Sequence, residues 1–344
     1  MKILMIGLGS IGQRHLRNIR GLYGEKHEIL AYRVRGLSHT FAPNMKIKNG
    51  VNLEEEFNIR TFYDLNEALK EKPDVAFITN ITSEHVPCAI RCAEAGCALF
   101  LEKPLGVEIE EAKKLEYLIN EKGLVAFMGF QNRYHPALIM LKRLLSFEEI
   151  GKIISADIEM GERLETMHTY EDYSTTYMAR QDMGGGVVLN QAIHELDYML
   201  WLFGVPKSVC AIGGKSSSLR IDVEDHCSAL FNFRGQDREI PVYLHADFIQ
   251  SPPVRRCKVI GEHGYIEVDL IQSHLTICKH DADINKINFQ NFERNDMFIA
   301  ELKDFMEAVD KKKKPTIPIR EGIMSLKMAL AIKQAFKVKA WISI

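Results

Sequence analysis

The chain has 344 residues, a length that predicts two domains at roughly 150 residues each. Lysine plus arginine number 44 and aspartate plus glutamate 46, so the net charge is −2, and 46% of the residues are hydrophobic. These ordinary globular proportions exclude a disordered, collagen-like or coiled-coil chain. Because neither sign of charge dominates, we expect no nucleic-acid partner and no attraction to an anionic membrane.

No apolar run approaches the roughly 18 residues of a membrane span, so no membrane partner is expected. The seven cysteines are an odd number without a Cys-x-x-Cys motif, which favours reduced thiols in the cytoplasm over a disulfide framework. Cys88 and Cys92 lie one helical turn apart, but no other ligand spacing accompanies them. We therefore expect core thiols there and no metal site.

The first third of the chain alternates strand-length apolar runs with helical periodicity, a pattern typical of a parallel sheet with crossover helices. It predicts a doubly wound α/β domain over residues 1–128. The predicted strands are Lys2–Ile6, Ile29–Val34, Asp74–Thr79, Ala98–Leu101 and Val125–Met128. The predicted helices are Ile11–Leu22, Leu65–Lys70, Glu84–Ala95 and Glu108–Glu121. Segment Gly36–Asn58 has no clear period and is expected to be an excursion between strands.

From about residue 150 the segments become longer and alternate, which predicts an α+β domain over residues 129–344 with a largely antiparallel, open sheet. Its predicted strands are Lys152–Met160, Ser208–Ile212, His226–Phe233, Val242–Phe248, Arg256–Ile260 and Tyr265–Asp269. Its predicted helices are Val188–Phe203 and Ile323–Lys337. Because these helices are too few to cover both faces, we expect a homodimer or homotetramer built through this sheet.

A glycine-rich turn, Gly7-Leu8-Gly9-Ser10-Ile11-Gly12, stands directly after the first strand and directly before the first helix. In that context glycines let the backbone approach a pyrophosphate, and the helix N-terminus receives the anion. A turn that merely needs glycine is the alternative. The predicted dinucleotide-binding residues of this turn are Gly7, Gly9, Ser10, Ile11 and Gly12.

The end of the second strand normally carries an acidic residue that accepts hydrogen bonds from the ribose of NAD. This chain has Arg33-Val34-Arg35 instead, and Arg33 stands 21 residues after Gly12. Two guanidinium groups, Arg33 and Arg35, can hold a 2′-phosphate by charge-assisted hydrogen bonds. The sequence therefore favours NADP(H) over NAD(H), with solvated strand-end arginines as the alternative.

The string Glu102-Lys103-Pro104 follows a predicted strand, which places Lys103 at the carboxyl edge of the parallel sheet. Ligands bind at that edge in open α/β sheets. Pro104 restricts the backbone of Lys103 to extended conformations and so helps to fix where its side chain points. This favours a substrate-facing lysine over a simple surface charge.

Three glycines, Gly184–Gly186, precede a predicted helix that bears Asn190, His194 and Asp197. On a continuous helix, Asn190 and His194 would project from one face and reach the same ligand. Histidine titrates near neutrality and can exchange a proton with an alcohol or ketone. On spacing alone, however, a core histidine with satisfied hydrogen bonds is the more common role.

Taken together these motifs resemble the Gfo/Idh/MocA oxidoreductases, and the resemblance extends along nearly the whole chain. The segments that carry it are Gly7–Gly12, Ile78–His85, Glu102–Pro104, Gln131–Pro136 and Gly184–Asp197. The run from Tyr170–Tyr173 to Tyr177–Arg180, and on to Trp201–Gly204, resembles members associated with bacterial surface-glycan and sugar-nucleotide pathways.

The resemblance implies an N-terminal Rossmann domain, a C-terminal sheet that packs against another subunit, and hydride transfer between nicotinamide and a sugar or cyclitol carbon. Lys103 would bind and polarise the reacting hydroxyl, and His194 would be the general acid/base. The implied cofactor side also includes Thr82, His85, Glu102 and Lys103. The implied substrate side includes Arg133, Tyr177, Arg180 and Asn190.

The leading hypothesis is thus an NAD(P)-dependent oxidoreductase that acts on a CH–OH group of a sugar nucleotide or sugar acid in glycan biosynthesis. An inositol (cyclitol) dehydrogenase is the second reading. The polyol dehydrogenases of the family have an aspartate where this chain has Asn190, and an amide cannot take up a proton. A third reading is a non-catalytic, cofactor-binding regulatory protein, because fold does not fix function. The presence of both Lys103 and His194 argues against it.

Overall fold

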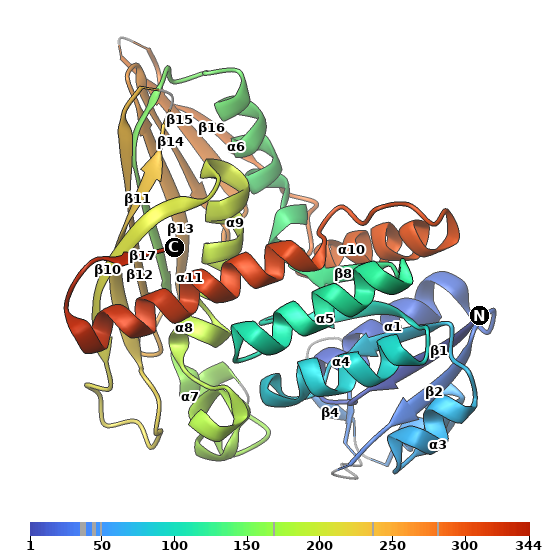
Figure 1. Cartoon of the computed structure of the whole chain (residues 1–344). Helices are drawn as coiled ribbons and strands as arrows, with labels where there is room; N and C mark the ends of the chain where they lie inside the picture. Colours follow the sequence, from blue (N-terminus) through green and yellow to red (C-terminus); the bar gives the residue numbers. More distant parts are fainter. Residues whose placement is uncertain (35–38, 43–45, 49, 168, 236, 281) are drawn as a thin grey trace. The chain divides into compact units, whose positions relative to one another are not determined.

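A computed structural model of the chain describes residues 1–34, 39–42, 46–48, 50–167, 169–235, 237–280 and 282–344 (Figure 1). The chain divides into two compact units. The first comprises Met1–Phe130 and Phe298–Ile323, and the second comprises Gln131–Met297 and Met324–Ile344. Residues 298–323 therefore belong to the first unit, although residues 131–297, nearly half of the chain, separate them from the rest of it in the sequence.

The first unit contains a six-stranded sheet in the order β5-β2-β1-β6-β7-β8, in which every pair is parallel. Its strands are β1 (Lys2–Ile6), β2 (Glu28–Tyr32), β5 (Ile59–Phe62), β6 (Val75–Ile78), β7 (Ala98–Glu102) and β8 (Ala126–Gly129). The predicted doubly wound parallel sheet is confirmed. The strand order reverses between β1 and β6, and ligands bind at such a switch point, outside the carboxyl ends of the strands.

Helices connect these strands, as the alternating pattern predicts. They are α1 (Ser10–Tyr23), α2 (Leu53–Phe57), α3 (Leu65–Lys70), the 3₁₀ turn η1 (Thr82–Glu84), α4 (His85–Glu94), α5 (Ile109–Lys122) and most of α10 (Arg294–Asp310). The predicted excursion holds a short antiparallel pair, β3 (Thr40–Phe41) and β4 (Ile47–Lys48), followed by α2. The Asn52 side chain caps α2 by accepting a hydrogen bond from the Glu54 backbone. Elements this short leave no readable period.

A cluster of phenylalanines forms the core beneath one face of this sheet. Phe77, Phe100 and Phe127 lie side by side on β6, β7 and β8, with ring centroids 4.9 and 5.6 Å apart. Phe305 of α10 packs 5.5 Å from both Phe77 and Phe100. Helix α10 therefore covers this face, a role that no local pattern in the sequence indicates.

The second unit contains a nine-stranded sheet in the order β16-β15-β14-β13-β9-β12-β11-β10-β17. Only β9 and β12 pair in parallel among the described strands, so the predicted largely antiparallel sheet is confirmed. Its strands are β9 (Ile153–Gly161), β10 (Pro206–Gly214), β11 (His226–Arg234), β12 (Glu239–Asp247), β13 (Val254–Gly261), β14 (Gly264–Asp269), β15 (His274–Lys279), β16 (Asn285–Asn288) and β17 (Ile342–Ser343).

Helices cover one face of this sheet. Helix α6 packs against β14 and β15 (Figure 1). Phe203 of α9 lies 5.7 Å from Phe233 of β11. The helices of this unit are η2 (Gln131–Tyr134), α6 (Pro136–Ser146), α7 (Leu164–Met167), η3 (Tyr173–Thr175), η4 (Tyr177–Ala179), η5 (Gln181–Met183), α8 (Val187–Asn190), α9 (Ile193–Phe203) and most of α11 (Ile319–Val338). The other face leaves large apolar side chains exposed. They are Ile212, Leu230, Tyr243 and Ile260.

All seven cysteines lie in the described part of the chain and are free thiols. Burial raises the pKa of Cys88 and of Cys97 to about 11, so both thiols stay protonated near neutrality. Among the described residues, no helix combines the length and the apolar composition that crossing a membrane requires.

Candidate active site

The carboxyl edge of the parallel sheet brings the glycine-rich turn against the loop that follows β6. Gly7 has a φ of +88°, and a Cβ atom there would lie 2.9 Å from the Asn80 Cα. A Cβ atom on Gly12 would lie 2.4 Å from the Gly7 carbonyl oxygen, which the Thr79 hydroxyl contacts at 2.7 Å. These two glycines are therefore required by the turn itself.

The N-terminus of α1 is suited to an anion. In α1, whose residues are all described, Gly9 is the N-cap without a side-chain capping bond, and the first turn carries no acidic residue. A Cβ atom on Gly9 would meet nothing within 4 Å, so the backbone faces open space at this point. The N–H groups of Ser10 and Ile11 lie in the first turn of α1, where the helix offers them no acceptor, and together with the helix dipole they fit the pyrophosphate of a dinucleotide.

Glu102 organises the loop that carries Lys103. Its carboxylate is 4% exposed, with Oε1 2.7 Å from His15 Nε2 and Oε2 accepting the Lys103 backbone N–H at 3.2 Å. Lys103 is half-buried, and its peptide bond to Pro104 is cis. The predicted residue Glu102 thus contacts protein groups and fixes the backbone from which the Lys103 side chain extends.

His85, a predicted cofactor-side residue, joins the loops after β6 and β7. Its Nδ1 lies 2.7 Å from the Pro104 carbonyl oxygen and its Nε2 lies 3.0 Å from that of Asn80. Burial lowers the pKa of His85, while the two carbonyl acceptors act in the opposite direction. Thr82 is buried at the start of η1 in the same loop. Both residues shape the edge at which Lys103 stands.

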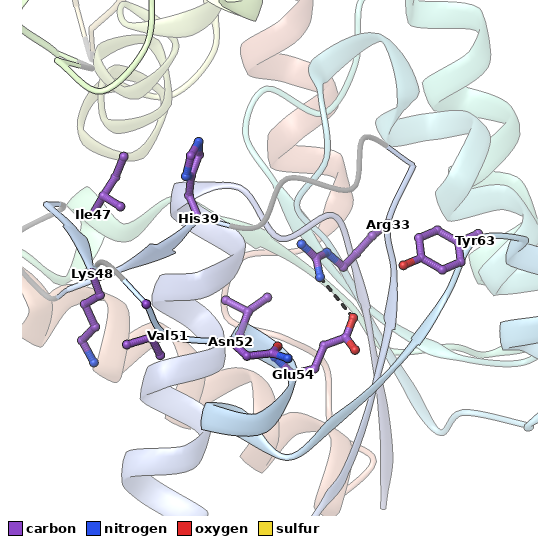
Figure 2. Close-up of a pocket in the computed structure, with 10 residues that line it drawn as sticks. Arg33, His39, Ile47, Lys48, Val51, Asn52, Glu54 and Tyr63 are labelled. Carbon is purple, nitrogen blue, oxygen red and sulfur yellow. Dashed lines mark hydrogen bonds and ion pairs between the residues drawn. The ribbon is translucent and has the colours of Figure 1, made fainter.

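Arg33 follows β2 and lines an open pocket of ≈ 570 Å³ (Figure 2). Its Nη1 lies 3.4 Å from Oε1 of Glu54, one of three glutamates in the first turn of α2. The Arg33 side chain is 10% exposed and that of Glu54 is 40% exposed. Glu54 therefore places an acidic group beside the end of β2, although the residue that directly follows β2 in the sequence is Arg33. Arg35 lies outside the described residues.

In the second unit the triple glycine packs against the chain's own turns. The Gly185 and Gly186 N–H groups donate to the Arg180 and Met178 carbonyl oxygens at 2.8 and 3.0 Å. Gly186 has a φ of +106°, and a Cβ atom there would clash with the Glu224 carboxylate at 2.2 Å. The close approach that these glycines permit is thus between protein segments.

The helix predicted over Val188–Phe203 is two helices, α8 and α9, and this corrects the i, i+4 placement of Asn190 and His194. The Ala192 N–H bonds to the Val187 carbonyl oxygen, five residues back, which interrupts the regular ladder. The Asn190 amide donates to the carbonyl oxygens of Gly184 and Gly186 at 3.0 and 3.2 Å. Asn190 therefore holds the glycine loop, and His194 lies buried in the first turn of α9.

Arg133 pairs with Asp197 of α9. Its Nε lies 2.9 Å from Oδ2 and its Nη2 lies 2.6 Å from Oδ1, a bidentate contact between two buried groups. Tyr177 is half-buried at the start of η4. Arg180 is exposed, with its Nε 3.6 Å from carboxylate oxygens of Asp182 and Asp222.

The predicted site residues therefore form two groups, one in each unit. The first unit holds the glycine turn, Arg33, Thr82, His85, Glu102 and Lys103 around its sheet edge. The second unit holds Arg133, Tyr177, Arg180, Asn190 and His194 around α8 and α9. Two further charged groups belong to these sites, Glu54 and Asp197. The sequence pattern does not predict their contacts with Arg33 and Arg133.

Comparison with known proteins matches both units. Residues 1–130 match the family model described as an oxidoreductase family with an NAD-binding Rossmann fold, and residues 138–267 match that of the GFO/IDH/MocA C-terminal domain.

Two curated relatives extend the match along the chain. A scyllo-inositol 2-dehydrogenase (NAD(+)) of Bacillus subtilis is 23% identical, with 98% of this chain and 94% of that protein covered. A UDP-N-acetylglucosamine 3-dehydrogenase of Acidithiobacillus ferrooxidans is 24% identical, with 90% and 88% covered. Among solved structures, a levoglucosan dehydrogenase in complex with NADH and levoglucosan shares the fold, with a TM-score of 0.84, 16% identity, and 100% and 99% of the two chains covered.

Alanine substitutions in the glycine turn separate folding from dinucleotide binding. Gly9→Ala should leave the melting temperature unchanged, because open space surrounds its Cβ, and should weaken NAD(H) binding by at least about tenfold by keeping the backbone away from the pyrophosphate. Gly12→Ala should also lower the melting temperature, because its Cβ meets the Gly7 carbonyl. Fluorescence titration with NADH and thermal unfolding measure the two effects.

Gly21→Ala, an exposed position in the same helix with no atom within 4 Å of its Cβ, is the matched control. A Gly9→Ala protein that binds NADH as tightly as the parent would contradict the placement of the pyrophosphate.

Proposed function

The chain belongs to the Gfo/Idh/MocA family of NAD-binding oxidoreductases, and from this premise we propose that it transfers a hydride between nicotinamide and a carbinol or keto carbon of a sugar. The observation that carries the proposal is the shared sheet edge, where the anion-binding start of α1 and the loop bearing Lys103 meet beside the strand-order switch. When bound, the nicotinamide supplies the hydride acceptor or donor. The residues of this chain then have to bind the sugar and handle its hydroxyl proton.

Lys103 and His194 are proposed for that chemistry. A carbinol that loses a hydride must also lose its hydroxyl proton, and the alkoxide that develops needs a positive charge nearby. Lys103 extends from a backbone that Glu102 holds, so its ammonium group is proposed to bind and polarise the hydroxyl. His194, in the first turn of α9, is proposed to exchange the proton.

The other residues of the second unit are proposed to bind and to position the sugar. The Arg133–Asp197 pair lies one helical turn from His194 and fixes α9. Asn190 can only hydrogen-bond, so it is proposed to affect substrate affinity more than rate. Tyr177 and the exposed Arg180 are proposed to contact the more polar part of the substrate.

For the substrate class we propose a sugar nucleotide or a related sugar acid. The similarity to a UDP-N-acetylglucosamine 3-dehydrogenase supports it. The similarity to a scyllo-inositol 2-dehydrogenase supports the second candidate, a cyclitol. The amide of Asn190, which cannot take up a proton, argues against a cyclitol. The test is to incubate the protein with NAD or NADP and panels of sugar nucleotides, free sugars and inositols while following reduced-nicotinamide absorbance. Turnover of inositols alone would replace the first class by the second, and no turnover at all would favour a regulatory protein.

For the cofactor we propose that NADP(H) binds more tightly than NAD(H) through the Arg33 guanidinium, with Arg35 secondary. Glu54 acts against this preference, because its carboxylate neutralises Arg33 and repels a 2′-phosphate. Glu54 is also able to accept hydrogen bonds from ribose hydroxyls, the task of the acidic residue that β2 lacks.

Substitutions at the two partners test the cofactor proposal. Arg33→Ala should lose about 1.5–3 kcal/mol of NADP affinity, the range for a hydrogen bond to a charged group, and leave NAD affinity nearly unchanged. Glu54→Gln, an isosteric change that removes the negative charge beside Arg33, should strengthen NADP binding. Titration calorimetry with both cofactors measures these changes, and equal losses for both in Arg33→Ala would refute the assignment.

Variants of the two reacting groups test the chemistry. His194→Ala and Lys103→Met should each slow single-turnover hydride transfer by at least about a hundredfold, the lower range for general acid/base groups, while dinucleotide binding persists. Lys113→Met, at an exposed position of α5, is the control. A His194→Ala enzyme with near-normal rates from mildly acidic to alkaline pH would show that the proton travels another way.

Residues 129–344 are proposed to supply substrate binding and assembly. On the face of the sheet that α6 and α9 leave open, Leu230 lies opposite both Tyr243 and Cys210, and Ile212 is 80% exposed. Covering such apolar side chains favours association, so we expect a homodimer or homotetramer through this face. Light scattering at micromolar concentration measures it. A monomer, or a Tyr243→Lys variant that assembles like the parent, would count against this interface.

A further inference from the structure

Helix α10 places a carboxyl group in the aromatic core of the first unit. Phe298, Glu301 and Phe305 stand at i, i+3 and i+7, so they share the helix face that packs on the sheet. Glu301 is 0% exposed, and neither of its carboxylate oxygens has a hydrogen-bond partner among the described residues. A glutamate in the middle of an apolar stripe costs stability unless another group compensates for it.

Two polar side chains face Glu301 in this core. One is Glu102 at the end of β7, and the other is His15 of α1; one ligand atom from each of the three residues lies within 4.8 Å of the others. Arg14 of α1, which stacks 4.6 Å over the Phe298 ring, is the nearby cation. Phe77 and Phe100 pack around the His15 ring and exclude water from the cluster.

The charges of this cluster cannot all be present together. Two carboxylates this close in a buried site repel each other, and neither ionises without a large desolvation cost. Glu102 is the better site for the negative charge, because it already faces His15 Nε2 and accepts the Lys103 backbone N–H. Glu301 is therefore the carboxyl group that carries a proton, because its oxygens contact neither a histidine nor a backbone N–H group.

We propose that Glu301 is a protonated carboxylic acid at neutral pH that, with His15, keeps the Glu102 carboxylate in the orientation that holds the Lys103 backbone. Glu301 and His15 are then positioning residues, and of the two carboxyl groups only that of Glu102 carries a negative charge. Burial raises the pKa of Glu301 well above its ordinary value, and Glu102 acts in the same direction, whereas Arg14 opposes them.

A metal ion is the competing occupant for one histidine and two glutamates. Two ligands bound about 2.1 Å from a tetrahedral zinc ion lie roughly 3.3 Å apart. His15 Nε2 and Glu102 Oε1 are 2.7 Å apart, which is a hydrogen-bond distance. The distance thus favours a direct hydrogen bond between His15 and Glu102 over a metal ion bound by both.

Infrared difference spectroscopy tests the protonation state without any substrate. At neutral pH, the parent-minus-Glu301→Gln spectrum should contain the carbonyl stretch of a protonated carboxylic acid. Glu307→Gln is the matched control on the same helix, because Glu307 is exposed and paired with Lys311; its difference spectrum should contain carboxylate bands only. Loss of carboxylate bands alone in Glu301→Gln would overturn the proposal, as would a stoichiometric metal found in the purified protein by elemental analysis.

The positioning role rests on the proposed function of Lys103, so it needs a second readout. Glu301→Gln keeps a neutral polar side chain facing Glu102 and should transfer hydride at close to the parent rate at neutral pH. Glu301→Leu presents only apolar groups to the buried Glu102 carboxylate and should be slower by about tenfold, the lower end of the cost of leaving a buried charged group without a polar neighbour. Equal rates in the two variants, with equal melting temperatures, would remove the positioning role. A parent protein without turnover would instead refute the proposed function, and the infrared result would stand independently of it.

Discussion

The Glu102 carboxylate is the constraint on which the first unit depends. It is buried at the end of β7, and its two oxygens contact groups from different parts of the chain: the His15 ring of α1 and the Lys103 backbone. Helix α1 begins at the glycine turn, so one carboxylate couples the helix that receives the pyrophosphate to the loop of the proposed reacting lysine. Hydrogen bonds to a charged group contribute about 1.5–3 kcal/mol, and a buried carboxylate left unpaired would cost at least as much.

Buried carboxylates paired with groups from other segments also fix a helix in the second unit. Helix α9 carries two fully buried acidic residues, Glu195 and Asp197, which pair with Arg255 of β13 and with Arg133 of η2. Removing one partner from a buried pair leaves an uncompensated charge, so each pair strongly disfavours any movement of the helix. His194 directly precedes Glu195 in the sequence. The two ion pairs therefore fix the helix turn from which the His194 side chain extends.

The sequence predicts those features that depend on local patterns. Strand-length apolar runs that alternate with helical periods predict the parallel sheet, and the glycine turn is recognisable from the strand before it and the helix after it. Three features escape such patterns. The helical pattern of α10 is hard to recognise because Glu301 interrupts its apolar stripe. Glu54 lies beside the end of β2 because of how an aperiodic segment folds. The interruption of the helix after Asn190 depends on hydrogen bonds between Asn190 and the glycine loop. Each depends on contacts between distant segments.

A double-mutant cycle between His15 and Glu102 tests the central coupling most directly. The free energy of unfolding in urea would be measured for the parent, His15→Asn, Glu102→Gln and the double variant. We expect a coupling energy of about 1.5–3 kcal/mol, because each single change already breaks the contact that the other removes. Additive losses, with no coupling between the two sites, would show that this hydrogen bond does not join α1 to the Lys103 loop.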